Sequence, residues 1–233
     1  MRIRVSLQMN DGSFSRLPPT AGMHFFRLMS RIPKNASAAR AAVSDKRNAI
    51  HRAAVEVFAA KGYFNSKVAD IASAAGVADG TVYLYFKSKE EILHYIFDRA
   101  MEEFIGDGLR ELAEIEAPDD KLRRVAELHL ERLGADRDLA VVFQVELRGS
   151  TKFMSEFSRA GFAKYLDIIK KTIDEGQKAG SFRKDIKPIV AAKIFYGALD
   201  EMVTNWILSN RAYPLRPMAN EVMKIFLGGI AAK

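Results

Sequence analysis

The side chains with the clearest chemical capability are concentrated in residues 80–89. This segment reads Gly-Thr-Val-Tyr-Leu-Tyr-Phe-Lys-Ser-Lys, so hydroxyl-bearing and apolar residues alternate before two lysines. Thr and Tyr hydroxyls and Lys ammonium groups bind phosphate oxygens, and the hydroxyls also reach base edges. Because Gly80 has no side chain, the backbone there can lie close to a phosphate or a base. The pattern indicates a surface that contacts nucleic acid, chiefly through its phosphates.

Other kinds of reactive site find little support in the sequence. Cysteine is absent, which excludes disulfides, zinc fingers, iron–sulfur clusters and thiol catalysis, and is typical of a reducing cytoplasm. The histidines have no metal-ligand spacing, and the order of a phosphate-binding loop is missing. We therefore expect no catalytic residues, no metal and no enzyme activity. The histidines are His24, His51, His94 and His129.

The residues before this segment must form helices that present it. Ala72 and Ala75 are small enough for two helices to approach closely, and Gly76 accepts a tight turn. In a helix that runs over residues 79–86, Val82 and Phe86 share one face and should pack inward. The outward face then carries Thr81, Tyr83, Tyr85 and Lys87. This spacing predicts a helix-turn-helix whose second helix enters the major groove of DNA.

Capping residues set the expected ends of these helices. Ser44 is a candidate N-cap for the first helix, which Gly62 should end, and Ser66 is a candidate N-cap for the second. Ser88 and Glu91 have the spacing of a capping box at the start of a longer helix. Periodicity alone leaves an alternative open, in which Tyr83 and Tyr85 are core aromatics of a plain helical bundle.

The run of residues 68–93, VADIASAAGVADGTVYLYFKSKEEIL, resembles the signature of TetR-family repressors. It departs from the family at Ala78, where many members have a capping Ser, and Asp79 is the expected substitute cap. The resemblance implies a homodimer on a palindromic DNA operator, with Ser66, Thr81, Tyr83, Tyr85 and Lys89 at positions that touch DNA. Charge alone adds Lys67 and Lys87, and Gly80 completes the predicted contact set.

Helical patterns continue to the end of the chain, with expected helices at 118–135, 138–147, 151–178, 188–208 and 217–231. Pro118 and Pro188 suit first helical positions. No convincing strand pattern is present, so we predict an all-α protein of about nine helices. The expected domains are a flexible basic tail at 1–44, a three-helix DNA-binding domain at 45–92, and a helical ligand-binding and dimerisation domain at 93–233.

The net charge of +7 belongs to the tail rather than to the helix-turn-helix. Residues 1–50 contain nine Lys or Arg and only two acidic residues, and the remaining charges cancel. The tail is a candidate source of additional phosphate contacts. The alternatives are that it has no dedicated role, or that translation starts later than Met1, since Met23 and Met29 are alternative start codons. No apolar run approaches the ~20 residues of a membrane span, and the N-terminus does not resemble a secretory signal.

The second half of the chain is rich in large apolar side chains that suit a cavity between helices. Each of them is equally compatible with an ordinary core or dimer interface. Polar residues within the apolar stretches are candidates to orient a ligand, to face solvent or to cross-link helices: Gln144, Glu146, Arg148, Asp200, Glu201, Thr204 and Asn205.

Three further segments are similar to the FadR-type, acyl-CoA-responsive branch of the same family. They are residues 138–148 (DLAVVFQVELR), 164–169 (KYLDII) and 194–206 (IFYGALDEMVTNW). The resemblance implies a repressor of fatty-acid metabolism genes that long-chain acyl-CoA releases from its operator. Arg148 and Arg159 are the candidates for the anionic head group. The full expected ligand set is Phe104, Phe143, Leu147, Arg148, Phe157, Arg159, Tyr165, Phe195, Tyr196, Leu199, Met202 and Trp206.

The resemblance also implies a homodimer through the two C-terminal helices, in which Gly197, Ala198 and Ala219 supply small residues. Packing of these helices within one subunit is the alternative. A regulator of an efflux pump is the main rival function, because Glu146, Asp200 or Glu201 would suit a cationic drug. A non-regulatory helical interaction module would require neither Gly80 nor the two tyrosines.

Overall fold

In a computed structural model the described residues are 34–159, 161–209 and 213–231, with side chains described for 43–156, 161–209 and 213–231. Residues 1–45 and 46–233 form two separate units. The helices are α2 (Lys34–Lys61), α3 (Val68–Ala74), α4 (Asp79–Tyr83), α5 (Lys89–Ala113), α6 (Pro118–Ala135), α7 (Arg137–Val141), the π-helical turn η1 (Val142–Glu146), α8 (Thr151–Arg159), α9 (Gly161–Ala179), α10 (Pro188–Leu208) and α11 (Met218–Ile230).

The all-α prediction is confirmed, since the described residues contain no β-strand beyond an isolated bridge between Phe182 and Ala231. They form ten α-helices rather than nine. The additional helix arises because the expected helix over 151–178 is interrupted between α8 and α9. At the start of α9, a side chain on Gly161 would put its Cβ 2.8 Å from the Cβ of Met101 on α5, so the two backbones approach closely there.

The predicted starts at Ser44 and at Asp138 are wrong. The helix expected to begin at Ser44 begins at Lys34, because five alanines between residues 36 and 42 favour helix. The prediction of a flexible tail is therefore wrong for 34–44, and its remainder, 1–33, lies outside the described residues. The helix expected at Asp138 is α7, which begins one residue earlier because Asp136 caps it by accepting a hydrogen bond from Leu139 N at 2.9 Å.

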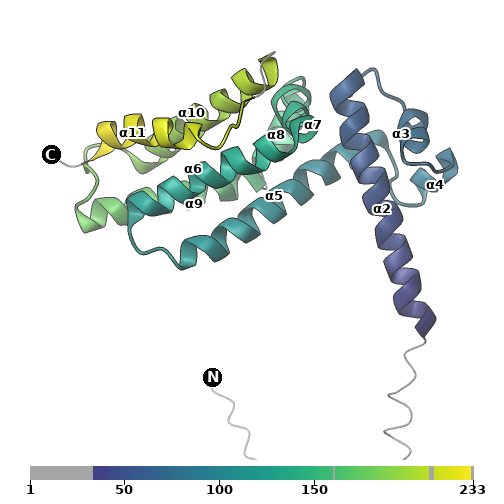
Figure 1. The fold of residues 1–233 in the computed structure, drawn as a ribbon, viewed down its shortest axis with the longest axis horizontal. Helices are drawn as coiled ribbons and strands as arrows, with labels where there is room; N and C mark the ends of the chain where they lie inside the picture. Colours follow the sequence, from purple (N-terminus) through teal and green to yellow (C-terminus); the bar gives the residue numbers. More distant parts are fainter. Residues whose placement is uncertain (1–33, 160, 210–212, 232–233) are drawn as a thin grey trace, which may run out of the picture. The chain divides into compact units, whose positions relative to one another are not determined.

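Residues 46–61 of α2 pack with α3, α4 and the start of α5 around one apolar core (Figure 1). Phe58, Ile71, Val82 and Ile92 are fully buried in it. The same core continues into the following region, because Val142 and Leu147 around η1 and Phe153 on α8 belong to it. The DNA-binding region is thus joined to the second half of the chain by shared packing as well as by α5.

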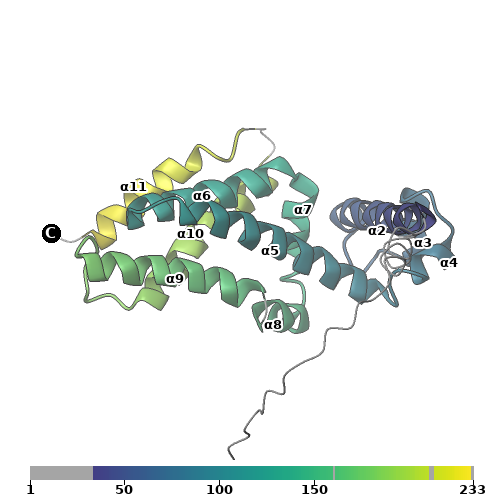
Figure 2. The same ribbon diagram turned by 90° about the horizontal axis from the view of Figure 1, so that it is seen from below.

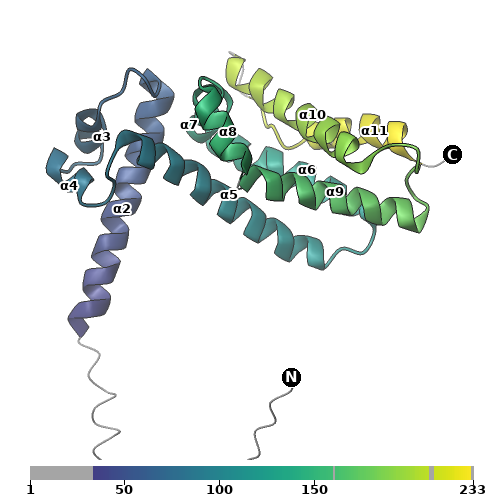
Figure 3. The same cartoon turned by 180° about the vertical axis from the view of Figure 1, so that it is seen from behind.

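The second half is a bundle of α5, α6, α9, α10 and α11 (Figure 2). Seen from behind, α9 lies beside α10, and α11 lies along the neighbouring side of α10 (Figure 3). Leu122, Ile169 and Phe195 are fully buried in the centre of this bundle. No helix among the described residues has both the length and the apolar character that crossing a bilayer requires.

Candidate nucleic-acid interface and ligand cavity

The helix-turn-helix has the predicted division between an inner and an outer face. Val82 and Phe86 are buried, whereas the Tyr83 side chain is 55% exposed. Gly80 and Lys87 are exposed, and Thr81 and Tyr85 are half-buried. Gly76 has a φ of +66°, a conformation that favours glycine, so the turn requires this residue. The predicted helix over 79–86 is wrong at its end, because α4 stops at Tyr83 and residues 84–88 form a turn, yet the burial of Val82 and Phe86 and the exposure of Tyr83 and Lys87 are as predicted.

Two of the predicted DNA contacts have other roles in this structure. Ser66 is only 3% exposed, and its hydroxyl donates to the Gly62 carbonyl at 2.6 Å, so this side chain is used within the fold and its contact with DNA stays a prediction. Lys89 Nζ donates to the Tyr63 and Ser66 carbonyls at 2.6 and 2.7 Å and lies over the Tyr63 ring. Burial lowers the pKa of Lys89. Its ammonium group therefore stabilises the loop between α2 and α3.

The predicted caps are confirmed in part. The Ser88 hydroxyl accepts from Glu91 N at 3.1 Å, but the Glu91 carboxylate accepts from Lys87 N rather than Ser88 N. Helix α3 has Lys67, not Ser66, at its N-cap, and Asp70 accepts from Lys67 N at 2.8 Å.

Helix α4 begins at Asp79 with Ala78 at the N-cap, so the prediction that Asp79 replaces the capping serine is wrong. Asp79 instead adds a negative charge to the first turn, where it interacts favourably with the positive end of the helix dipole.

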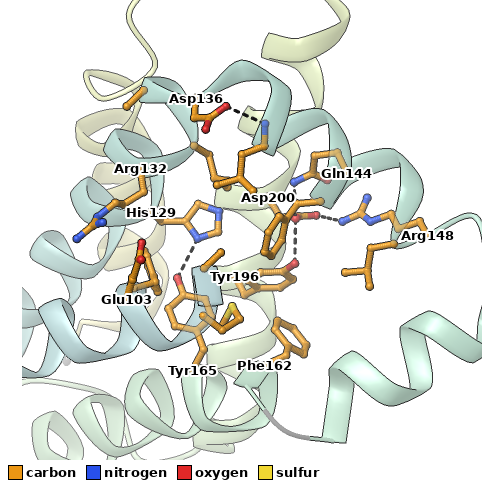
Figure 4. A pocket seen from close by; sticks show the side chains of 18 of the residues that line it. Glu103, His129, Arg132, Asp136, Gln144, Arg148, Phe162, Tyr165, Tyr196 and Asp200 are labelled. Carbon is orange, nitrogen blue, oxygen red and sulfur yellow. Dashed lines mark hydrogen bonds and ion pairs between the residues drawn. The ribbon is translucent and has the colours of Figure 1, made fainter. Parts of the chain in front are cut away.

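A cavity of about 420 Å³ lies among α5, α6, α9, α10 and η1 (Figure 4). Six of the predicted ligand residues line it: Phe104, Phe143, Leu147, Arg148, Tyr165 and Tyr196. The other lining residues are Ala100, Met101, Glu103, His129, Arg132, Leu133, Ala135, Asp136, Leu139, Gln144, Met154, Phe162 and Asp200. The walls are mostly apolar, and a few polar groups converge on the interior.

Four predicted ligand residues lie elsewhere: Phe195, Leu199, Met202 and Trp206. They form one stripe of α10, at spacings of three and four residues, that packs within the bundle. Phe195 contacts Phe226 of α11, and Trp206 Nε1 donates to the Tyr213 carbonyl. Tyr196 and Asp200 occupy the neighbouring stripe, which faces the cavity. The side chains of Phe157 and Arg159 lie outside the described residues.

Asp200 is the centre of a polar cluster at one side of the cavity. Its carboxylate accepts from Gln144 Nε2 and from the Tyr196 hydroxyl, both at 2.9 Å, and pairs with Arg148 (Figure 4). Asp200 is buried, while the Arg148 side chain is 41% exposed. Thr204 Oγ1 donates to Gln144 Oε1 at 3.0 Å. The sequence had offered Gln144 and Asp200 only as general polar candidates, because no local pattern shows that they meet.

Of the remaining polar residues, Glu201 and Asn205 do not line the cavity, whereas Arg132, which the sequence did not single out, does. Glu201 and Asn205 are exposed and hydrogen-bond each other rather than facing the cavity. Arg132 lines the cavity and pairs with Asp107. The cavity wall therefore carries two arginines, Arg132 and Arg148, each with a carboxylate partner.

Glu146 connects η1 to the DNA-binding region. Its carboxylate is buried and accepts from Tyr63 N, in the loop between α2 and α3, at 2.7 Å. Gln144, two residues earlier on the same turn, lines the cavity. Aromatic contact between Tyr63 and Phe153 of α8 reinforces the junction. One π-helical turn therefore contacts both the cavity and the loop that precedes the helix-turn-helix.

Within the described residues, one group of side chains has the spacing of metal ligands. Glu90, His94 and Glu156 each place one potential ligand atom within 4.8 Å of the others. Glu90 pairs with Lys152, and His94 lies 2.9 Å from Glu156. The Glu90–Lys152 ion pair and the contact between His94 and Glu156 both join α5 to α8.

Family models match most of the chain. Residues 50–96 match the model described as bacterial regulatory proteins, tetR family. Residues 97–229 match the model of the YsiA-like protein, C-terminal region. The boundary between the two matches falls within α5, four residues after the predicted domain boundary at 92.

Similar proteins include regulators of fatty-acid metabolism. The fatty acid metabolism regulator protein of Bacillus subtilis is 37% identical over 181 residues, which cover 78% of this chain and 93% of that protein. The structure of FadR from Bacillus subtilis in complex with stearoyl-CoA has a TM-score of 0.74 at 36% identity, covering 78% of this chain and 98% of that one. FadR from Bacillus halodurans gives a TM-score of 0.73 with the same identity and coverage.

Proposed function

Because the chain belongs to the TetR family of bacterial regulatory proteins, we propose that it is a transcriptional repressor of fatty-acid metabolism genes that long-chain acyl-CoA releases from DNA. The observation that carries the proposal is the apolar cavity with two wall arginines, joined through η1 to the helix-turn-helix. As a DNA-binding regulator, the protein would act in the cytoplasm.

The exposed face of α4 is the proposed operator contact. Tyr83 protrudes most among its hydroxyl-bearing residues, Gly80 and Thr81 flank it on the helix, and Lys87 is exposed in the segment that follows α4. Lys67 is exposed at the start of α3 and is proposed as a phosphate contact beside it. Hydroxyl and ammonium groups of this kind position a helix on DNA through phosphates, and a smaller number of contacts to bases then give specificity.

The cavity has the chemistry that an acyl chain requires. Burial of a methylene group contributes ~0.8 kcal/mol, so a long chain gains its affinity from the apolar wall residues such as Phe104, Phe143 and Phe162. Arg148 and Arg132 are the proposed partners of the anionic CoA phosphates. A phosphate would compete with Asp200 or Asp107 for them, because both arginines are already paired.

A homodimer through α10 and α11 is also proposed. An exposed stripe of α10 carries Val190, Ile194, Gly197 and Leu208, at spacings that place them on one face. Ile225 of α11 is 80% exposed. Apolar side chains aligned in this way are typical of a surface that another subunit covers. Ala219 is buried within the subunit, so the prediction that it supplies a small residue to the interface is wrong.

Two connections would transmit ligand binding to DNA. Helix α5 begins in the DNA-binding region, and its residues Ala100 and Phe104 line the cavity. The turn η1 joins Gln144 at the cavity to Glu146 at Tyr63 N. Since a ligand acts only through its different affinities for two states, filling the cavity must favour an arrangement of α5 and η1 that no longer suits the operator.

The test uses an operator selected from fragmented genomic DNA and fluorescence anisotropy of the full chain. Stearoyl-CoA is expected to weaken operator binding by about 5- to 150-fold at saturation, the usual range of allosteric coupling. Free stearate and a cationic drug such as ethidium should have little effect. Release by the drug and not by acyl-CoA would instead support an efflux regulator. The present geometry disfavours that function, because two of the three carboxylates expected to suit such a drug, Glu146 and Glu201, do not line the cavity.

Replacement of Glu146 by alanine is expected to uncouple the ligand from the operator. The variant should bind stearoyl-CoA nearly as the wild type does, because Glu146 does not line the cavity. The ratio of operator dissociation constants with and without stearoyl-CoA should fall at least 5-fold, since a buried charge-assisted hydrogen bond contributes about 1.5–3 kcal/mol. Glu102→Ala, an exposed carboxylate on α5, is the matched control. An unchanged ratio in Glu146→Ala would show that η1 does not transmit the signal.

A further inference from the structure

His129 belongs to the wall of the cavity and has a buried polar ring atom without a hydrogen-bond partner among the described residues. The residue is 6% exposed, lines the cavity, and is surrounded by the rings of Phe104, Tyr165 and Tyr196 (Figure 4). Its Nδ1 lies 3.1 Å from the Tyr165 hydroxyl. Its Nε2 is buried, and no group in the described part of the chain forms a hydrogen bond with it.

The hydrogen bond at Nδ1 determines which nitrogen of the ring carries the proton. Burial lowers the pKa of His129 to about 4, so the imidazole is neutral at physiological pH and one nitrogen is protonated. If Nδ1 carried the hydrogen, both the Tyr165 O–H and the Nε2 lone pair would be left without partners. If the Tyr165 hydroxyl donates to Nδ1, only one group is unpaired, the Nε2–H. The second arrangement is the more stable.

We propose that His129 Nε2–H donates a hydrogen bond to an oxygen atom of the effector within the cavity. His129 then selects ligands that have a hydrogen-bond acceptor next to its ring. The inference rests on the proposed acyl-CoA function and extends it. Two parts of such a ligand carry the required oxygen: the thioester carbonyl, and a hydroxyl or keto oxygen on the acyl chain. Their shared property is a hydrogen-bond acceptor within an otherwise apolar molecule.

The energetic reason is the asymmetry between making and omitting a buried hydrogen bond. A ligand without an acceptor fills the cavity and leaves the Nε2–H unpaired, which lowers its affinity. A ligand with an oxygen at this point satisfies it. We therefore expect about a 10-fold preference for ligands with the oxygen, the equivalent of about 1.4 kcal/mol.

The experiment measures binding of three ligands with the same chain length to the full protein by calorimetry. The ligands are stearoyl-CoA, the S-octadecyl-CoA thioether that lacks the carbonyl, and 3-hydroxystearoyl-CoA. Wild type should prefer stearoyl-CoA about 10-fold over the thioether if the carbonyl is the acceptor. If the chain carries the acceptor, it should instead prefer the hydroxy compound about 10-fold over stearoyl-CoA. In His129→Phe, which keeps an aromatic ring, that preference should disappear.

Two further variants make the result decisive. His129→Gln, whose amide provides an N–H near the position of Nε2, should restore much of the preference. Tyr165→Phe, which removes the hydroxyl that sets the tautomer, should reduce it about 3-fold, and it serves as the test if His129→Phe does not fold. A preference that persists unchanged in the folded variants would overturn the role of His129. Failure of wild type to bind all three ligands would instead contradict the proposed acyl-CoA function.

Discussion

Replacement of Tyr83 by alanine is expected to abolish operator retardation without unfolding the protein. The side chain is 55% exposed on the outer face of α4, while the neighbouring Val82 and Phe86 maintain the core, so little stability depends on it. Loss of a contact of this kind costs about 1–3 kcal/mol, and a dimer on a palindrome loses it twice. The operator dissociation constant should therefore rise about 30-fold to more than 1,000-fold.

The controls separate DNA contact from folding. Leu109→Ala, an exposed apolar residue on α5, should leave operator affinity unchanged. Tyr83→Phe distinguishes a hydroxyl contact from packing of the ring against a sugar or base. The melting temperature of Tyr83→Ala should stay within about 2 °C of wild type, as is usual for exposed sites. Undiminished operator binding by Tyr83→Ala would disprove the assignment of α4 as the recognition helix.

Replacement of Asp200 by alanine is expected to give the largest loss of stability in the ligand-binding half. The substitution removes the acceptor of Gln144 and Tyr196 and leaves Arg148 without its carboxylate partner. Loss of one partner of a buried ion pair costs about 3–5 kcal/mol, and the lower end applies because Arg148 is 41% exposed and reaches water. A loss of about 3 kcal/mol corresponds to a melting temperature about 6–12 °C lower for a chain of this size.

Asp167→Ala is the matched control for this prediction. Asp167 forms an exposed pair with Lys171 on α9, and such surface pairs contribute about 0–1 kcal/mol. Thermal unfolding followed by circular dichroism at pH 7 compares the two variants. If Asp200→Ala unfolds within about 2 °C of the Asp167 variant, the polar cluster contributes no more than a surface pair.

Local sequence determined the helix-turn-helix because its information lies within single helices and turns. The periodicity of 80–87 separates Val82 and Phe86 from Tyr83, and the positive φ of Gly76 follows from its place in a tight turn. The starts of α6 and α10 at Pro118 and Pro188 follow from the fixed φ of proline. These features require no knowledge of which helices later pack together.

Tertiary structure alone decided which side chains meet. Ser66 and Lys89 are suitable phosphate ligands by type, but both are used within the fold, because loop carbonyls lie within reach of their donors. On α10, the adjacent residues Phe195 and Tyr196 point to different sides of the helix, Phe195 into the core and Tyr196 into the cavity. Because α10 is apolar on most of its surface, its sequence pattern does not predict which of the two faces the cavity. The cavity set His129, Gln144 and Asp200 comes from three different elements. Their proximity depends on long-range packing, which the sequence encodes only through the whole bundle.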